Sequence, residues 1–248
     1  MIAEEIGLKW ARRIALAFVA WAEEEQKSRT IKIRPFDPTE QITLAFYEAG
    51  EAQLADIGKL IGMSVKFDLR SPEAEAWIKK YSAQQIKYIS SCQKDAIKRI
   101  KLIAFQDGLT IQQQRKLIKE YIGLLPNHIT AVRTYRDGLI KSGTNEATAE
   151  KMAAKYRDKL LRYRANMIAE TEGMAASNAG TTEANLGAIK RGIIKDGEYK
   201  EEIVASGLGN VCDRCHNLDG KRFEVGKGPT LPIHPHCHCG KVLVSANG

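Results

Sequence analysis

Four of the five cysteines lie within the last 37 residues, and their spacing constrains the fold of that segment more than any other feature of the chain. Cys212 and Cys215 form a C-x-x-C pair, and Cys237 and Cys239 form a C-x-C pair after 21 intervening residues. Closed tetrahedral zinc sites are built from such thiolate pairs, with Zn–S distances of about 2.3 Å. The spacing therefore predicts a structural zinc ion that joins two separate segments of the chain.

Histidines near the second cysteine pair compete with the thiols for the four positions around a zinc ion. We favour four thiolate ligands, from Cys212, Cys215, Cys237 and Cys239. His234 is the alternative to one member of the C-x-C pair, or it orients a thiolate through a hydrogen bond. His238, between the last two cysteines, adds another possible ligand, whereas we expect His216 and His236 to be surface histidines.

The redox compartment decides between a metal site, disulfides and unrelated free thiols. Near the N-terminus, an apolar run over residues 14–22 follows basic residues, as in a signal peptide. However, Glu4 and Glu5 precede the run, and the acidic residues 23–25 follow it. These residues favour an amphipathic or buried helix, and no apolar run approaches the 18 or so residues of a membrane span. We therefore expect reduced thiols, a cytosolic chain and no membrane contact.

Basic residues concentrate in the middle of the chain. The net charge is +8, and residues 71–200 contain 23 Lys and Arg against 14 Asp and Glu, a net charge of +9. Such a surplus suits a nucleic acid or an acidic protein surface, although solvated helix faces are the alternative explanation. No aromatic interleaving or groove-reading motif accompanies the charge.

Capping residues, prolines and glycines predict where the helices begin and end. The segment 30–38 contains two prolines and is expected to be a linker or an edge strand. Leu44, Tyr47, Leu54, Ile57 and Ile61 are expected to form the buried stripe of the second helix. The expected helices cover residues 3–27, 39–62, 72–105, 110–121, 126–140 and 145–168, with a weaker continuation to 194.

The sequence pattern changes from helical to strand-like after residue 197. Short strand-like runs cover residues 202–205, 221–225 and 241–245, around the cysteine turns. The fold class is therefore expected to be mainly α, a long-helix body with a small C-terminal zinc-stapled β element. The expected divisions of the chain are an N-terminal helical region (1–70), a helical body (71–197) and a zinc-knuckle β terminus (198–248).

Two motifs, in order along the chain, resemble one family. Residues 162–180, RYRANMIAETEGMAASNAG, resemble the R-A-x-x-I-A-R-T-E…A-x-N-x-G helix of the Mu F-like phage head morphogenesis family. Residues 211–220 and 231–239 are similar to its C-x-x-C-x-x-L-D-G…P-x-H-P-x-C-R-C terminus. The resemblance covers about residues 72–245. Glu170 and His238 stand where the family usually has arginine, so the roles of those arginines are not transferred.

The resemblance implies a phage minor head protein. Such a protein associates with the portal protein and capsid proteins and assists head assembly and DNA packaging or retention. Its place would be the interior of the virion head or the portal vertex, and the host cytoplasm during assembly. Packaged DNA is a further expected partner, through the basic helices of residues 71–200.

Two other functions fit parts of the sequence. One is a basic zinc-containing DNA-binding protein, and the other is a zinc-stapled nuclease. Catalytic zinc keeps an open position beside a general base, and the nearby Asp213, Asp219 and Glu224 lie in turn-like or strand-like sequence that suggests no such arrangement. A nucleophilic pair of Cys237 and His234 is disfavoured because four clustered thiols suit a shared metal. We therefore expect no enzyme.

Overall fold

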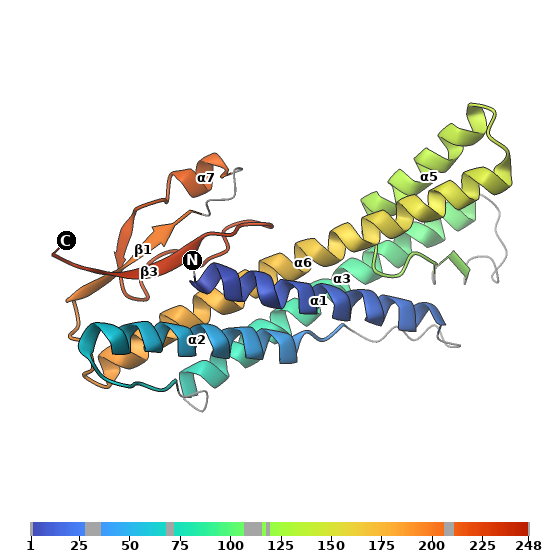
Figure 1. Cartoon of the computed structure of the whole chain (residues 1–248). Coiled ribbons are helices and arrows are strands. Elements are labelled where there is room, and N and C mark those ends of the chain that lie inside the picture. The colour runs from blue at the N-terminus through green and yellow to red at the C-terminus, as the bar shows by residue number, and fades with distance from the viewer. Residues whose placement is uncertain are drawn as a thin grey trace. The chain divides into compact units, whose positions relative to one another are not determined.

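The computed structural model describes residues 2–27, 36–67, 72–106, 116–117, 120–205 and 211–247 (Figure 1). Within them, the expected mainly α fold with a small β element near the C-terminus is confirmed. The elements are α1 (Ile2–Lys27), α2 (Thr39–Ile61), α3 (Pro72–Gln106), α5 (Pro126–Lys141), α6 (Glu146–Lys190), β1 (Tyr199–Val204), α7 (Asp213–His216), β2 (Arg222–Glu224) and β3 (Gly240–Ser245). The expected linker over 30–35 and most of the expected helix over 110–121 lie outside the described residues. No described helix is long and apolar enough to cross a membrane.

The chain forms two compact units that each combine separate segments. The first unit contains Met1–Ile14, Pro38–Ser82 and Met167–Gly248, and the second contains Ala15–Asp37 and Ala83–Asn166. The expected division of the chain into three continuous parts, with boundaries at residues 70 and 197, stays a prediction.

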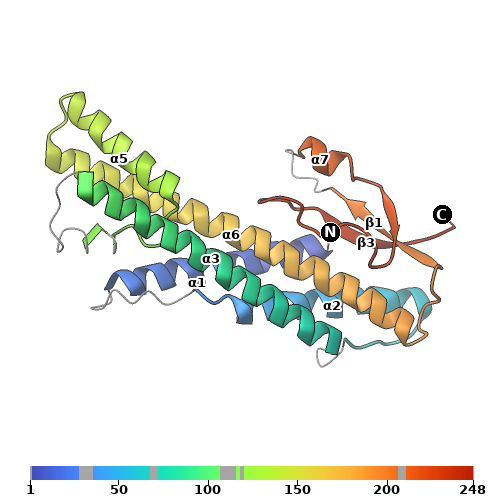
Figure 2. The same ribbon diagram turned by 180° about the vertical axis from the view of Figure 1, so that it is seen from behind.

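Helices α2 and α6 of the first unit lie side by side (Figure 2), and they pack closely at small residues. Its apolar core includes Phe46 of α2 and Ala176 of α6, both with no exposed surface. Gly180 of α6 lies against α2 so closely that a Cβ atom on it would overlap the carbonyl oxygen of Phe46. A glycine at this position therefore permits the contact between the two helix backbones.

The buried face of α2 differs from the expected stripe. Leu54 and Ile57 are fully buried as expected, but Leu44 is 39% exposed and Tyr47 is 36% exposed. Ile42, Ala45, Phe46 and Ala49 are buried in their place. The expected stripe was wrong in this half of the helix, because the buried face combines the large Ile42 and Phe46 with the small Ala45 and Ala49. The expected stripe followed only the large apolar residues of the neighbouring face.

The second unit is built around the C-terminal part of α1, most of α3, α5 and the N-terminal part of α6. Phe18 is fully buried, and its ring packs edge-on against the ring of Phe36 at a centroid distance of 5.1 Å. Arg164 of α6 is only 1% exposed and donates a hydrogen bond to the carbonyl of Gly123. Its guanidinium lies 5.7 Å from the centre of the Phe18 ring. Burial lowers the pKa of Arg164.

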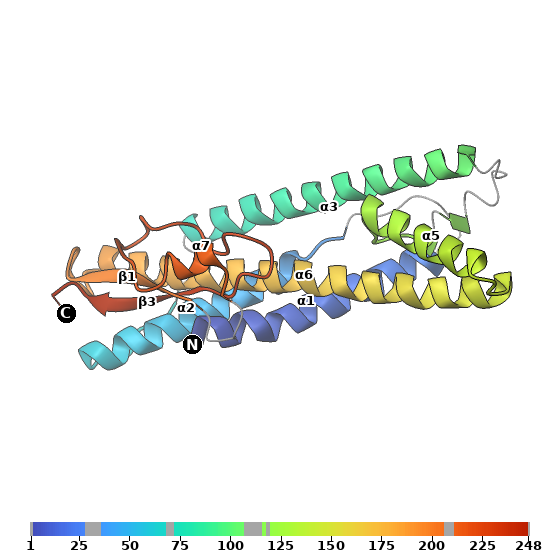
Figure 3. The same cartoon turned by 90° about the horizontal axis from the view of Figure 1, so that it is seen from above.

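A three-stranded antiparallel sheet in the order β2-β1-β3 belongs to the first unit and packs on α6 (Figure 3). A buried polar network joins the sheet to the helix. Glu201 of β1 and Lys241 of β3 form an ion pair at 3.2 Å, with 1% and 7% of their side chains exposed. Asn185 of α6 donates to Glu201 at 3.2 Å, and Lys241 donates to Thr182 of α6 at 3.2 Å. These bonds fix the position of the sheet on the helix.

Candidate metal centre

The C-x-x-C pair is shaped by the short helix α7. Cys212 precedes the helix and Cys215 lies within it, and the amide of His216 donates to the carbonyl of Cys212 at 2.9 Å. This turn directs both sulfur atoms to one side. Cys215 is 3% exposed, whereas Cys212 is exposed to solvent.

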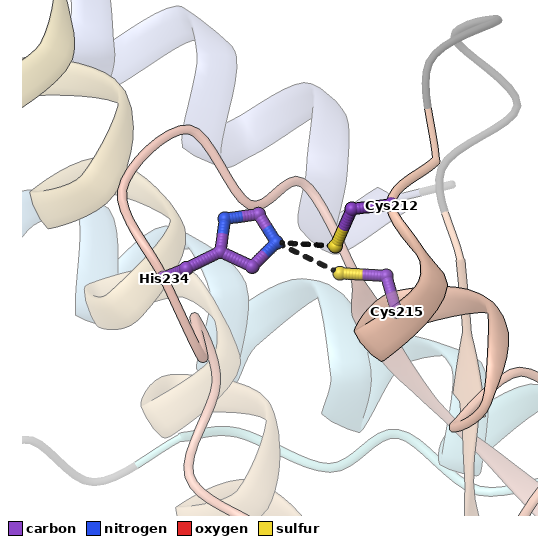
Figure 4. A group of neighbouring side chains, drawn as sticks. All are labelled: Cys212, Cys215 and His234. Atoms are coloured by element: carbon purple, nitrogen blue, oxygen red, sulfur yellow. Dashed lines mark hydrogen bonds between the residues drawn. The ribbon is translucent and has the colours of Figure 1, made fainter.

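His234 faces both sulfurs of this pair (Figure 4). Its Nε2 atom lies 3.1 Å from Sγ of Cys212 and 3.1 Å from Sγ of Cys215. Its Nδ1 atom lies 2.7 Å from the carbonyl oxygen of Pro235. A carbonyl only accepts hydrogen bonds, so Nδ1 carries the proton and the lone pair of Nε2 points toward the sulfurs. Histidines that bind metals are commonly oriented by such a bond from the other ring nitrogen.

The C-x-C pair approaches the same centre from the segment before β3. Cys237 and Cys239 are 1% and 2% exposed, and Sγ of Cys237 lies 3.6 Å from Sγ of Cys215. Two groups of possible metal ligands result, one of Cys212, Cys215 and His234 and the other of Cys215, Cys237 and Cys239. Within each group the ligand atoms lie within 4.8 Å of one another. Cys215 belongs to both groups.

The donors fit the chemistry of zinc. Tetrahedral coordination with Zn–S bonds of about 2.3 Å would place two sulfurs roughly 3.8 Å apart, and a sulfur and an imidazole nitrogen roughly 3.5 Å apart. The separations of 3.1 and 3.6 Å around Cys215 are close to these values. All four cysteines of the cluster are free thiols. A zinc ion bound here would join α7 to the segment before β3.

The two thiols of the C-x-x-C pair differ in acidity. The backbone amide of Cys215 donates to Cys212 and, with further hydrogen bonds from Cys215 and Arg214, lowers the pKa of the Cys212 thiol to about 7. Burial raises the pKa of Cys215 well above its usual range, as do its hydrogen bonds with Cys239, Cys212 and Cys237. Zinc binding would therefore release protons from the cluster, and its affinity should rise with pH.

A family model described as Phage Mu protein F like protein matches residues 97–242. The chain belongs to this family. The matched range contains both cysteine pairs, His234 and the part of α6 on which the sheet packs. Neither the curated proteins nor the solved structures gave a match to the chain.

The side chains of Glu170 and His238, which differ from the motifs that the sequence resembles, contact each other. Oε2 of Glu170, on α6, lies 3.3 Å from Nε2 of His238. The same oxygen lies 2.6 Å from Nδ1 of His236, which is half-buried and has a positive φ of 59°. His236 is thus not the ordinary surface histidine that we expected, whereas His216 is exposed. Glu170 anchors the C-x-C segment to α6 through both neighbours of Cys237.

Asn178, in the A-x-N-x-G part of the motif, has a second anchoring role that the sequence did not reveal. Its side-chain amide donates to the carbonyl of Cys239 at 3.0 Å, and also to the carbonyl of Met174 at 2.9 Å. Asn178 is 2% exposed. A polar residue at a buried position of a helix was the available signal, but its partner lies 61 residues away in the sequence.

Proposed function

We propose that the protein is a minor head protein of a phage that associates with the portal vertex and assists head assembly and DNA packaging or retention. The observation that carries the proposal is the family match over residues 97–242. The coarser function, phage head morphogenesis, follows from the family. The portal and capsid proteins are the proposed partners, and the head interior or portal vertex is the proposed location.

The proposed cofactor is one structural Zn²⁺ ion. Cys212 and Cys215 supply two ligands, and the others come from Cys237, Cys239 and His234. Five donors for four tetrahedral positions suit a closed site, in contrast to a catalytic zinc site with an open position. The ion would hold the C-terminal β element together, because so small an element buries little apolar surface of its own.

A structural role, without catalysis, is also proposed. Asp219 is one of the three carboxylates closest in sequence to the cysteines, and its Oδ1 accepts the amide of Ala205 at 2.8 Å. The following Gly220 has a φ of +71°, as a chain reversal requires. These contacts support a turn at Asp219 and not a general base. Purified protein with added Mg²⁺ or Zn²⁺ should leave DNA uncut, and cutting would support the nuclease alternative.

Copurification tests the proposed partner. Coexpressed with the portal protein of its own phage, the native chain should copurify with it. The Cys212→Ser/Cys237→Ser variant should lose zinc and the ordered terminus. Cys92→Ser is the matched control, because Cys92 lies on α3 in the second unit. This variant should keep its zinc ion and should still copurify with the portal protein. A zinc-loaded chain that never copurifies with portal or capsid proteins would contradict the proposed function.

A further inference from the structure

Four exposed basic side chains form one row on α6. Lys151, Lys155, Lys159 and Arg162 are all exposed and follow one another at intervals of four, four and three residues. At 100° per residue these positions fall within an arc of about 80°, and they extend over roughly 16 Å of the helix axis. We call these four residues the α6 basic stripe. All of them belong to the second unit.

The charges of the α6 basic stripe are not neutralised by carboxylates in the part of the chain that the structure describes. None of its four members forms an ion pair there. Other cations nearby do: Arg157 lies 2.9 Å from Asp158, and Arg136 binds Glu146 and Glu150 across the α5–α6 hairpin. Asp158 is next to the stripe on the helix surface, but its carboxylate pairs with Arg157 and not with a member of the stripe.

The part of α6 that carries the α6 basic stripe is packed on its opposite side. Ala149, Ala153 and Leu161, on the other side of this part of α6, are buried. Helix α5 lies beside this part of α6 (Figure 1), and the ring of Tyr156 packs against the ring of Tyr135 on α5 at a centroid distance of 5.1 Å. The helix therefore fixes the spacing of the four charges before a ligand binds.

We propose that the α6 basic stripe binds the phosphate backbone of nucleic acid. Its four charges are aligned, at about one per 5 Å of helix, and a DNA strand presents one phosphate per 3.4 Å of its axis. Three of the four residues are lysines, which are depleted from protein–protein interfaces but are common phosphate ligands. The inference rests on the proposed function in one respect, because it identifies the surface that packaged DNA would contact.

The salt dependence of duplex DNA binding tests the inference. The variant Lys151→Gln/Lys155→Gln/Lys159→Gln/Arg162→Gln should bind at least about tenfold more weakly at low salt. Its slope of log K against log salt concentration should be shallower by roughly 3 to 4, since each phosphate contact contributes about 0.9. The single variant Lys155→Gln should change the slope by about 1. Zinc content and circular dichroism would confirm that each variant is folded.

A matched control separates the stripe from net charge. Lys59, Lys79, Lys190 and Arg222 each lie 2.7–3.6 Å from a carboxylate in the first unit. Changing all four to Gln removes the same charge, and the control should keep the wild-type slope. Equal losses in both quadruple variants would overturn the proposal. So would a stripe variant that keeps DNA affinity but no longer copurifies with portal protein, since the stripe would then be a protein-binding surface. Failure to bind portal protein with normal DNA binding would reject the proposed function alone.

Discussion

At the level of single residues, His234 is the side chain whose role the structure sharpens most. Sequence spacing left it as an alternative ligand. Its Nε2 lies 3.1 Å from two sulfurs while its Nδ1 is held by the Pro235 carbonyl, which is the arrangement of a bound imidazole. We therefore propose a ligand set of Cys212, Cys215, His234 and one cysteine of the C-x-C pair.

Replacing His234 tests this ligand set. We expect His234→Ala to lower zinc affinity by at least about tenfold, measured by competition with a chelating dye. His216→Ala, which changes an exposed histidine of α7, is the control and should leave the affinity unchanged. Unchanged affinity in His234→Ala would instead support the four-cysteine set.

Glu172 is a second residue with a measurable consequence. It is 5% exposed in the first unit, and burial raises its pKa to about 7, partly offset by a hydrogen bond from Tyr81. A raised pKa means that the folded chain holds a proton which the unfolded chain loses above about pH 4.5. The contribution of Glu172 to stability should therefore fall as pH rises from about 4.5 to 7, by about 3 kcal/mol in total.

The variant Glu172→Gln should remove this pH dependence. We expect the variant to exceed the wild type in free energy of unfolding by up to about 3 kcal/mol at pH 8, and to match it near pH 4. Urea unfolding of both proteins across this range would show the difference. A constant difference at every pH would mean that Glu172 does not titrate as its burial indicates.

At the level of elements, the sequence predicted helix ends better than buried faces. Asn145 caps the N-terminus of α6, where its Oδ1 accepts the amide of Thr148 at 2.9 Å, and Pro126 begins α5. These signals are local, so the sequence contains them. α6 nevertheless runs without a break through Gly173 and Gly180, where only a weak helical pattern was expected. The reason for a glycine at 180 is its contact with α2, which is 134 residues away.

Glycine substitutions in α6 test this explanation. Gly180→Ala should destabilise the protein by about 1 to 3 kcal/mol or more, because the new methyl group would overlap the backbone of Phe46. Gly187→Ala is the control in the same helix, since nothing lies within 4 Å of the added atom. It should stabilise the protein by about 0.5 to 1 kcal/mol through helix propensity alone. Opposite signs in thermal unfolding are expected, and a stabilising Gly180→Ala would refute the close contact.

At the level of the whole molecule, the proposed metal centre would give the C-terminal β element a stability that its small size does not supply. The sequence predicted the two cysteine pairs, but not the bonds that attach them to α6 through Glu170 and Asn178. Those bonds depend on which face of the helix the segment meets, and no local pattern contains that information. Within the described residues, the bonds of Glu170 and Asn178 anchor the C-x-C segment to α6. Helix α7 contacts the C-x-C segment through the cysteine cluster.

Removal of the metal should therefore have a local effect. A structural zinc ion contributes on the order of 10 kcal/mol of apparent free energy. A strong chelator should abolish hydrogen-exchange protection in residues 211–247 while the helices of the second unit stay protected. Simultaneous loss of protection in both units would show that the metal stabilises the entire chain.

Native mass spectrometry of the freshly purified chain tests the proposed zinc site most directly, because one spectrum reports metal content and thiol oxidation together. We expect one zinc ion per chain and no disulfide. A folded chain without metal, or one in which the four C-terminal cysteines are joined as cystines, would contradict it.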